Sequence, residues 1–352
     1  MYSKSSRYSS WQNRSIHWQQ IDWLLLLMVL GLTFLGGMMI RRTELNQPVT
    51  DWWQHWLFGG IGLAIVLGIA RISYKSFLRW HWITYGVTNG LLIAVIGLGN
   101  SAKGAQRWIT IAGFNFQPSE FAKVGLIITL AAILHRRPAD TLPSFLRALL
   151  FTAPPWLLVF TQPDLGTSLV FGAILLGMLY WANANPGWLL LLVSPLVAAI
   201  LYSLNLPIWI VWVALMGIVG WLTLPSRGVS SLVAIGVNLS AGLLGQVLWH
   251  ILKDYQKDRL IVFLDPDKYP LGAGYHLIQS RIAIGAGELW GQGLNQGTQT
   301  QLNFIPEQHT DFIFSSIGEE LGFVGSVCLL LMFLFVCWRL LRVACQAQNN
   351  FG

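Results

Sequence analysis

The acidic residues of this chain are concentrated in one polar stretch of an otherwise apolar sequence. Nine of the fifteen Asp and Glu residues fall between Asp254 and Glu320. Charge is costly beside a bilayer, so acids gathered between apolar runs indicate a working surface. Asp311 stands where the polar stretch returns to apolar sequence, and a partly desolvated carboxylate at such a boundary is a good proton acceptor. We therefore rank Asp311 first among the candidate functional residues.

Other charged and polar residues are placed where an anionic headgroup would lie, and cations there would stabilise a departing phosphate group. The candidates for headgroup binding are Lys103, Arg107, Trp108, Glu120, Lys123, Arg259, Arg281 and His309. Glu120 and Lys123 share one helix face, so they either form an ion pair that orients the helix or line a headgroup cavity. The histidines are typical of hydrogen-bonding loop residues, and we predict no protein metal site.

Composition identifies the elements that must position these residues. Of 352 residues, 54% are hydrophobic and 11% are charged, whereas soluble domains carry roughly 25% charged residues. The sequence therefore predicts an all-α, polytopic membrane bundle. The net charge of +7 comes mostly from short loops between apolar runs, which is a topology signal and argues against nucleic-acid binding. The three cysteines are interpreted as small apolar residues of the membrane segment.

About twenty apolar residues cross a bilayer as a helix, and ten segments meet this condition. The predicted spans are 20–40, 52–71, 80–99, 118–135, 145–162, 165–182, 187–204, 207–224, 229–251 and 311–338. We expect residues 1–19 and 339–352 to form tails around a transmembrane domain of residues 20–338, which includes a large loop at 252–310. Lys and Arg are denser in the loops that share a side with the N-terminus. The N-terminus is therefore predicted to be cytoplasmic and the large loop extracytoplasmic.

Residue chemistry alone does not separate an enzyme from a transporter here, but a series of ordered motifs does narrow the choice. The motifs are Lys-Gly-Ala-Gln-Arg-Trp at 103–108, Phe-Gln-Pro-Ser-Glu at 116–120, Gln-Pro-Asp-Leu-Gly-Thr at 162–167, Asp-Pro-Asp-Lys-Tyr-Pro-Leu-Gly-Ala-Gly-Tyr-His at 265–276, Gly-Thr-Gln-Thr-Gln-Leu at 297–302, Pro-Glu-Gln-His-Thr-Asp-Phe-Ile-Phe at 306–314 and Gly-Glu-Glu-Leu-Gly at 318–322. In this order they resemble the SEDS family (shape, elongation, division and sporulation), and its RodA branch more than its FtsW branch.

The resemblance implies a peptidoglycan glycosyltransferase of the bacterial plasma membrane that polymerises lipid II during cell-wall elongation. It also implies a class B penicillin-binding transpeptidase and other elongation-complex membrane proteins as partners. The family's essential acid corresponds to Asp311, which would take the proton from the 4-hydroxyl of the acceptor sugar. A divalent cation such as magnesium could accompany the lipid pyrophosphate. A lipid II flippase and a catalytically incomplete scaffold for the transpeptidase are the alternatives.

Two departures from the family pattern bear on this interpretation. Nine spans precede the large loop where the family typically has about seven, so residues 194–226 are predicted to add a helical hairpin. The family usually continues with two more helices and a Pro-Leu-Pro…Ser-Tyr-Gly-Gly motif, which this sequence does not contain. We therefore expect a cavity that lacks one wall.

Overall fold

The chain forms two compact units, each built mainly from long apolar helices. The computed structural model describes residues 22–43, 52–102, 105–111, 114–162, 164–251, 257, 262, 265, 267, 270, 274–305, 308–347 and 349–352. One unit combines residues 1–73 with 254–346, and the other combines residues 74–253 with 347–352. Distant parts of the sequence therefore meet in the first unit.

In the described part of the chain, ten long helices lie at the positions of the ten predicted spans. They are α1 (Trp23–Thr43), α2 (Trp52–Ala70), α3 (Lys75–Leu98), α4 (Pro118–Arg136), α5 (Leu142–Thr161), α6 (Leu165–Trp181), α7 (Pro186–Leu204), α8 (Leu206–Thr223), α9 (Arg227–Ile251) and α13 (Ile313–Cys345). All except α3 and α6 are long and apolar enough to cross a membrane by length and composition. The all-α membrane architecture is therefore confirmed.

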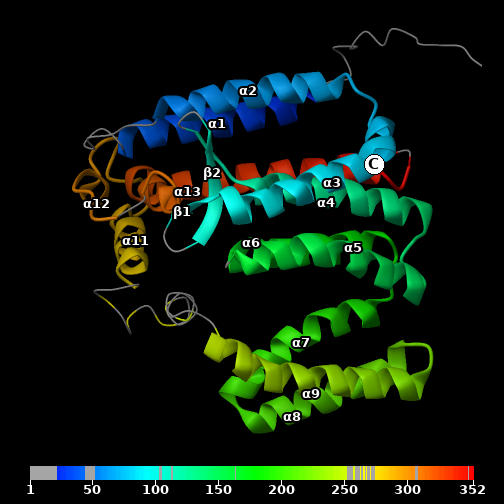
Figure 1. The fold of residues 1–352 in the computed structure, drawn as a ribbon. Coiled ribbons are helices and arrows are strands. Elements are labelled where there is room, and N and C mark those ends of the chain that lie inside the picture. The colour runs from blue at the N-terminus through cyan, green and yellow to red at the C-terminus, as the bar shows by residue number, and fades with distance from the viewer. Residues whose placement is uncertain are drawn as a thin grey trace, which may run out of the picture. The chain divides into compact units, whose positions relative to one another are not determined.

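The second unit contains two packed groups of helices (Figure 1). Helices α3 to α6 enclose a core in which Leu92, Leu130 and Phe171 are fully buried. Helices α7, α8 and α9 pack together around Ala198, Trp209 and Val213. The predicted hairpin at 194–226 corresponds to the end of α7 and to α8.

A small antiparallel sheet lies between α3 and α4, where the sequence had predicted only a loop. Its strands are β1 (Asn100–Ala102), β2 (Ala105–Ile111) and β3 (Phe114–Phe116), in the order β1-β2-β3. The register pairs Asn100 with Trp108 and Ile109 with Phe116. Strands this short carry too little alternation to be recognised from sequence, and cross-strand pairing creates the sheet.

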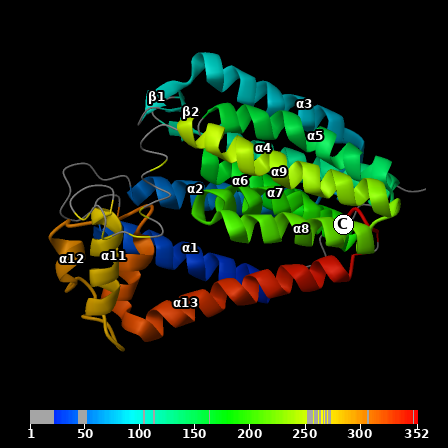
Figure 2. The same ribbon diagram turned by 90° about the horizontal axis from the view of Figure 1, so that it is seen from below.

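The first unit packs α1 against α2 and against α13, as Figure 2 shows for the long red part of α13. Asp22 precedes α1, and its carboxylate accepts hydrogen bonds from the Leu25 amide (3.2 Å) and from Arg339 Nε (2.6 Å). The hydrogen bond from Arg339 holds the pKa of Asp22 below its ordinary value. Asp22 thus both caps α1 and joins it to the far end of α13.

Helix α13 is broken near its beginning, which the sequence did not predict. Gly322 has φ 67° and ψ −165°, a conformation that is essentially restricted to glycine. The segment before the break, Ile313–Leu321, contains Glu319 and Glu320, and the apolar span begins at Phe323. Asp311 therefore does not lead straight into a membrane helix, because a short polar helix intervenes.

The break is stabilised by a loop that supplies the backbone hydrogen bonds a continuous helix would have made. The amides of Phe323 and Val324 donate to the carbonyls of Glu288 (2.8 Å) and Leu289 (3.1 Å). In return, the carbonyls of Glu319 and Glu320 accept from the loop amides of Gln292 (2.9 Å) and Gly293 (3.2 Å). A helix end beside a membrane needs such partners, since orphan backbone groups are costly there.

We expect Gly322→Ala to destabilise the protein by about 1–3 kcal/mol, the usual cost of a non-glycine residue in such a conformation. A β-carbon at this position would also meet the Gly291 amide nitrogen and, at 2.7 Å, the Trp290 carbonyl carbon. The measurement is thermal unfolding of the purified protein in detergent.

Gly285→Ala is the matched control, because the space around Gly285 on a neighbouring helix is open. Alanine is the better helix former, so this variant should melt at or above the wild-type temperature. Equal melting of the two variants would show that the break at Gly322 does not contribute to stability.

Candidate functional site

Asp311 lies in a turn two residues before the start of α13, with an exposed side chain. In the described part of the chain its carboxylate has no hydrogen-bond or ion-pair partner. The two acids within α13, Glu319 and Glu320, are in contrast both paired. An exposed, unpaired carboxylate held on a rigid turn is available to accept a proton.

Gln308 fixes the chain just before Asp311. Its side chain is fully buried, and the two hydrogens of Nε2 are shared among three acceptors: the carbonyl of Thr43 (3.1 Å), the carbonyl of Thr300 (3.2 Å) and Oδ1 of Asn303 (2.8 Å). These three acceptors belong to the end of α1 and to the segment around α12 (Thr298–Gln301). One amide group therefore ties the turn that carries Asp311 to two other elements.

Glu319 is the central buried charge of this region. Its carboxylate accepts hydrogen bonds from the amides of Gln299 (2.7 Å) and Thr300 (2.9 Å) and from the hydroxyls of Thr298 and Thr300. All of these donors lie in α12. A carboxylate with four donors is fully satisfied, so its burial is tolerated. At Gly297 a β-carbon would come within 2.7 Å of the carboxylate, and the Gly-Thr-Gln-Thr sequence thus matches the space around Glu319.

The neighbouring acid, Glu320, forms an ion pair with α1. Arg42 Nη1 lies 3.2 Å from Glu320 Oε2, and the Glu320 side chain is completely buried. Arg42 precedes Thr43, the residue whose carbonyl accepts from Gln308. Two adjacent acids therefore connect the start of α13 to α12 and to α1.

Helix α11 (Tyr275–Ala286) completes the surroundings of Asp311. Ser280 Oγ and Ser315 Oγ are 2.5 Å apart, and the His276 ring lies 6.1 Å from the ring of Phe312. Figure 1 shows α11 and α12 at the same end of the unit as the start of α13. Arg281 is exposed on α11.

The predicted headgroup candidates divide between the two units. Arg281 and His309 belong to the unit that carries Asp311, and His309 is half-buried in the turn before it. Arg107, Trp108, Glu120 and Lys123 belong to the other unit. Lys103 and Arg259 lie outside the described residues.

Arg107 holds the turn between α5 and α6. Its Nε donates to the Gln162 carbonyl (3.2 Å), and its Nη1 lies 3.8 Å from Asp164 Oδ1. Asp164 also caps α6 by accepting from the Thr167 amide and hydroxyl. The neighbouring Trp108 is exposed on β2. Arg107 therefore already has a carboxylate partner, whereas Trp108 is 37% exposed.

Glu120 and Lys123 form the ion pair that their spacing allowed. Lys123 Nζ lies 2.8 Å from Glu120 Oε2, and 54% of the Glu120 side chain is exposed. The pair is therefore not a buried ion pair within the helix bundle. It is an accessible polar surface at the first turns of α4.

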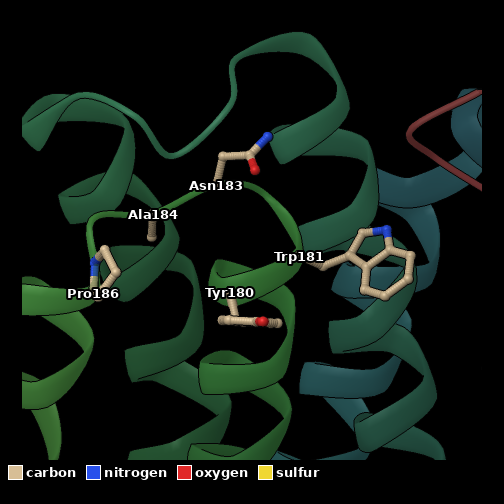
Figure 3. Close-up of a pocket in the computed structure, with 5 residues that line it drawn as sticks. All are labelled: Tyr180, Trp181, Asn183, Ala184 and Pro186. Carbon is tan, nitrogen blue, oxygen red and sulfur yellow. The ribbon is translucent and has the colours of Figure 1, made fainter.

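No group of three His, Cys, Asp or Glu side chains in the described part of the chain could hold a metal ion. A divalent cation bound by the protein alone does not fit these residues, and we derive no step through one. The hollow drawn in Figure 3, lined by Tyr180, Trp181, Asn183, Ala184 and Pro186 between α6 and α7, contains no charged group and receives no role.

Comparisons with known proteins agree with this arrangement of motifs. Residues 18–352 match the family model of FtsW, RodA and SpoVE, described as "Cell cycle protein". The chain belongs to the SEDS family. It is 36% identical over 296 residues to the peptidoglycan glycosyltransferase MrdB of Escherichia coli K12, covering 83% of this chain and 67% of that protein. It is 31% identical over 367 residues to peptidoglycan glycosyltransferase RodA of Treponema pallidum, covering 94% and 84%.

Solved structures show the same SEDS fold. A chain from a study titled "Structural coordination of polymerization and crosslinking by a peptidoglycan synthase complex" is 26% identical, with a TM-score of 0.64 over 95% of this chain and 81% of that one. The rod shape determining protein RodA of Thermus thermophilus is 21% identical, with a TM-score of 0.53 over 95% and 78%.

Sequence reasoning missed Glu319, Gln308 and Asp164 as the residues that organise the SEDS chain locally. Each lies in a motif that supported the resemblance, yet its type alone suggested no particular partner. The available signal was the acid pair of Gly-Glu-Glu-Leu-Gly inside an apolar run, because acids in that setting require partners.

We predict that Glu319→Gln strongly destabilises the protein. A glutamine retains one carbonyl oxygen and turns an NH₂ group toward amides and hydroxyls, and each buried donor left without an acceptor costs about 1–3 kcal/mol. Glu120→Gln removes an acid of the same size from an exposed ion pair, where the loss is about 0–1 kcal/mol.

Thermal unfolding of both variants in detergent provides the comparison. The melting temperature should fall by many degrees for Glu319→Gln and stay close to wild type for Glu120→Gln. A wild-type melting temperature for Glu319→Gln would show that the contacts between Glu319 and α12 are dispensable.

Proposed function

We propose that Asp311 is the general base of this SEDS-family peptidoglycan glycosyltransferase and that lipid II is its substrate. Asp311 takes the proton of the acceptor sugar's 4-hydroxyl as that oxygen attacks the anomeric carbon of the donor. The bond from that carbon to the undecaprenyl pyrophosphate breaks, and the pyrophosphate departs with its electron pair. Positioned proton acceptors of this kind contribute about 10²–10⁴-fold to rate.

The observation that carries the proposal is the contrast between Asp311 and its neighbours. Glu319 and Glu320 are buried and paired, whereas Asp311 is exposed and has no partner among the described residues. Gln308 holds the preceding turn at three points. A base needs this combination of a fixed backbone and a free carboxylate.

The cations are proposed to stabilise the departing pyrophosphate. Arg281 is exposed on the unit that carries Asp311, and Lys123 is partly exposed on the other. Because Arg107 is engaged with Asp164 and the Gln162 carbonyl, its proposed contribution is to position Trp108 beside the headgroup.

The membrane orientation and the partner belong to the same proposal. The N-terminus is placed in the cytoplasm and the region of Asp311 on the extracytoplasmic face of a bacterial plasma membrane, as the Lys and Arg distribution favours. A class B penicillin-binding transpeptidase is proposed as the partner. The similar chain from a peptidoglycan synthase complex supports this.

Asp311→Asn should lower lipid II polymerisation by at least about 100-fold, because an amide cannot accept the proton. Polymer is measured in reconstituted membranes, and lipid II binding is measured in parallel and should persist. Asp267→Asn, which changes another exposed acid of the same polar stretch, is the control and should keep wild-type activity. Wild-type polymer from Asp311→Asn would remove Asp311 from the chemistry.

Fluorescent lipid II translocation, measured in the same liposomes, separates the enzyme from a flippase. We expect polymerisation to depend on Asp311 and translocation to be the same with wild type, with Asp311→Asn and without protein. Translocation that requires the protein, with no polymer formed, would favour the transporter.

Orientation can be tested with single cysteines in a chain whose own cysteines are replaced by alanine. Gln296→Cys should react with a membrane-impermeant maleimide added outside the cells, whereas Ser226→Cys, in the loop between α8 and α9, should react only after permeabilisation. The reverse pattern would place the region of Asp311 in the cytoplasm.

A further inference from the structure

The loop that stabilises the break in α13 also exposes two large apolar side chains. Leu289 is 61% exposed and Trp290 is 79% exposed. They are adjacent, and they lie between the exposed polar residue Glu288 and the glycine at 291. Neither contributes to a described hydrophobic core, so their exposure requires another explanation.

Backbone contacts fix the height of this pair relative to the membrane span. The Leu289 carbonyl accepts from the Val324 amide (3.1 Å), and a β-carbon built on Gly322 would lie 2.7 Å from the Trp290 carbonyl carbon. Phe323 and Val324 form the first turn of the apolar part of α13. A helix rises about 1.5 Å per residue, so these bonds locate Leu289 and Trp290 within a few ångströms of the end of the span.

The surface beside the pair is already apolar. Phe323 and Val324 are themselves exposed in the protein, as expected for residues of a membrane-spanning helix that face lipid. Leu289 and Trp290 extend this lipid-facing surface beyond the helix. Tryptophan is the residue most typical of the boundary between acyl chains and headgroups, because its ring is apolar and its N–H can reach water or a headgroup.

We propose that Leu289 and Trp290 are an interfacial anchor that inserts into the bilayer at the headgroup–acyl boundary. The partner of this surface is the lipid bilayer itself. Gly291 and Gly322, both with positive φ, permit the close backbone approach that holds the anchor on the span. The anchor keeps the segment that contains α11 and α12 at the membrane surface, whatever the role of Asp311.

The test uses an environment-sensitive fluorophore on single cysteines of the full chain. The background carries Cys328→Ala, Cys337→Ala and Cys345→Ala, and the label is placed by Trp290→Cys or, in a second variant, by Leu289→Cys. Gln296→Cys is the aqueous control, since Gln296 is an exposed polar residue of the same loop, and Leu330→Cys marks the interior of the span. Each protein is reconstituted in phosphatidylcholine–phosphatidylglycerol vesicles.

Lipids that carry a spin-label quencher near the headgroup should quench the label at position 290 or 289 several-fold more than the label at 296. Lipids quenched near the chain end should favour position 330 instead. Because both side chains are exposed, we expect the substitutions to leave the fold intact, and a monodisperse chromatographic profile verifies this.

Two results would overturn the anchor. A label at 290 and 289 that remains as aqueous as the one at 296 would place the pair in water. A label that is shielded from water yet unquenched by either lipid would mean that protein, and not lipid, covers this surface.

Discussion

The buried carboxylate of Glu319 is the interaction on which the region around Asp311 depends. An ionised acid inside a protein must be fully hydrogen-bonded, and four donors of α12 meet this requirement. Once α12 is held there, its Thr300 carbonyl becomes an acceptor for Gln308. The turn that follows then carries Asp311 outward. The need to hydrogen-bond the buried Glu319 thus fixes α12 and, through Gln308, the turn that carries Asp311.

The glycine break in α13 complements this arrangement. A continuous helix would have formed all of its own backbone hydrogen bonds. The loop at 288–293 would then have had no backbone partners on α13. By interrupting the helix, Gly322 frees the amides of Phe323 and Val324 and two carbonyls on the preceding turn, and the loop binds all four groups. The polar stretch is therefore attached to the membrane span by main-chain bonds, which do not depend on the loop's side chains.

Each of the two units holds its own candidate residues by contacts within that unit. Asp311 and Arg281 belong to the unit of α1, α2 and α13, while Trp108 and Lys123 belong to the unit of α3 to α9. In the second unit Asp164 performs a task like that of Glu319, because it caps a helix and engages Arg107. In each unit a partly or fully buried acid organises the backbone, and other residues remain free to meet a ligand.

The amino-acid sequence by itself determined the membrane class, the ten helices, the family and the identity of Asp311 as the leading candidate. Runs of about twenty apolar residues and ordered motifs are local properties, so they survive without coordinates. Only the tertiary structure decided that Glu319 binds α12, that Gln308 reaches Thr43, that short strands pair and that α13 breaks at Gly322. These features arise from contacts between residues up to 265 positions apart. Local residue types do not specify such contacts. An acid within an apolar run indicates that hydrogen-bond partners are needed, but not which residues supply them.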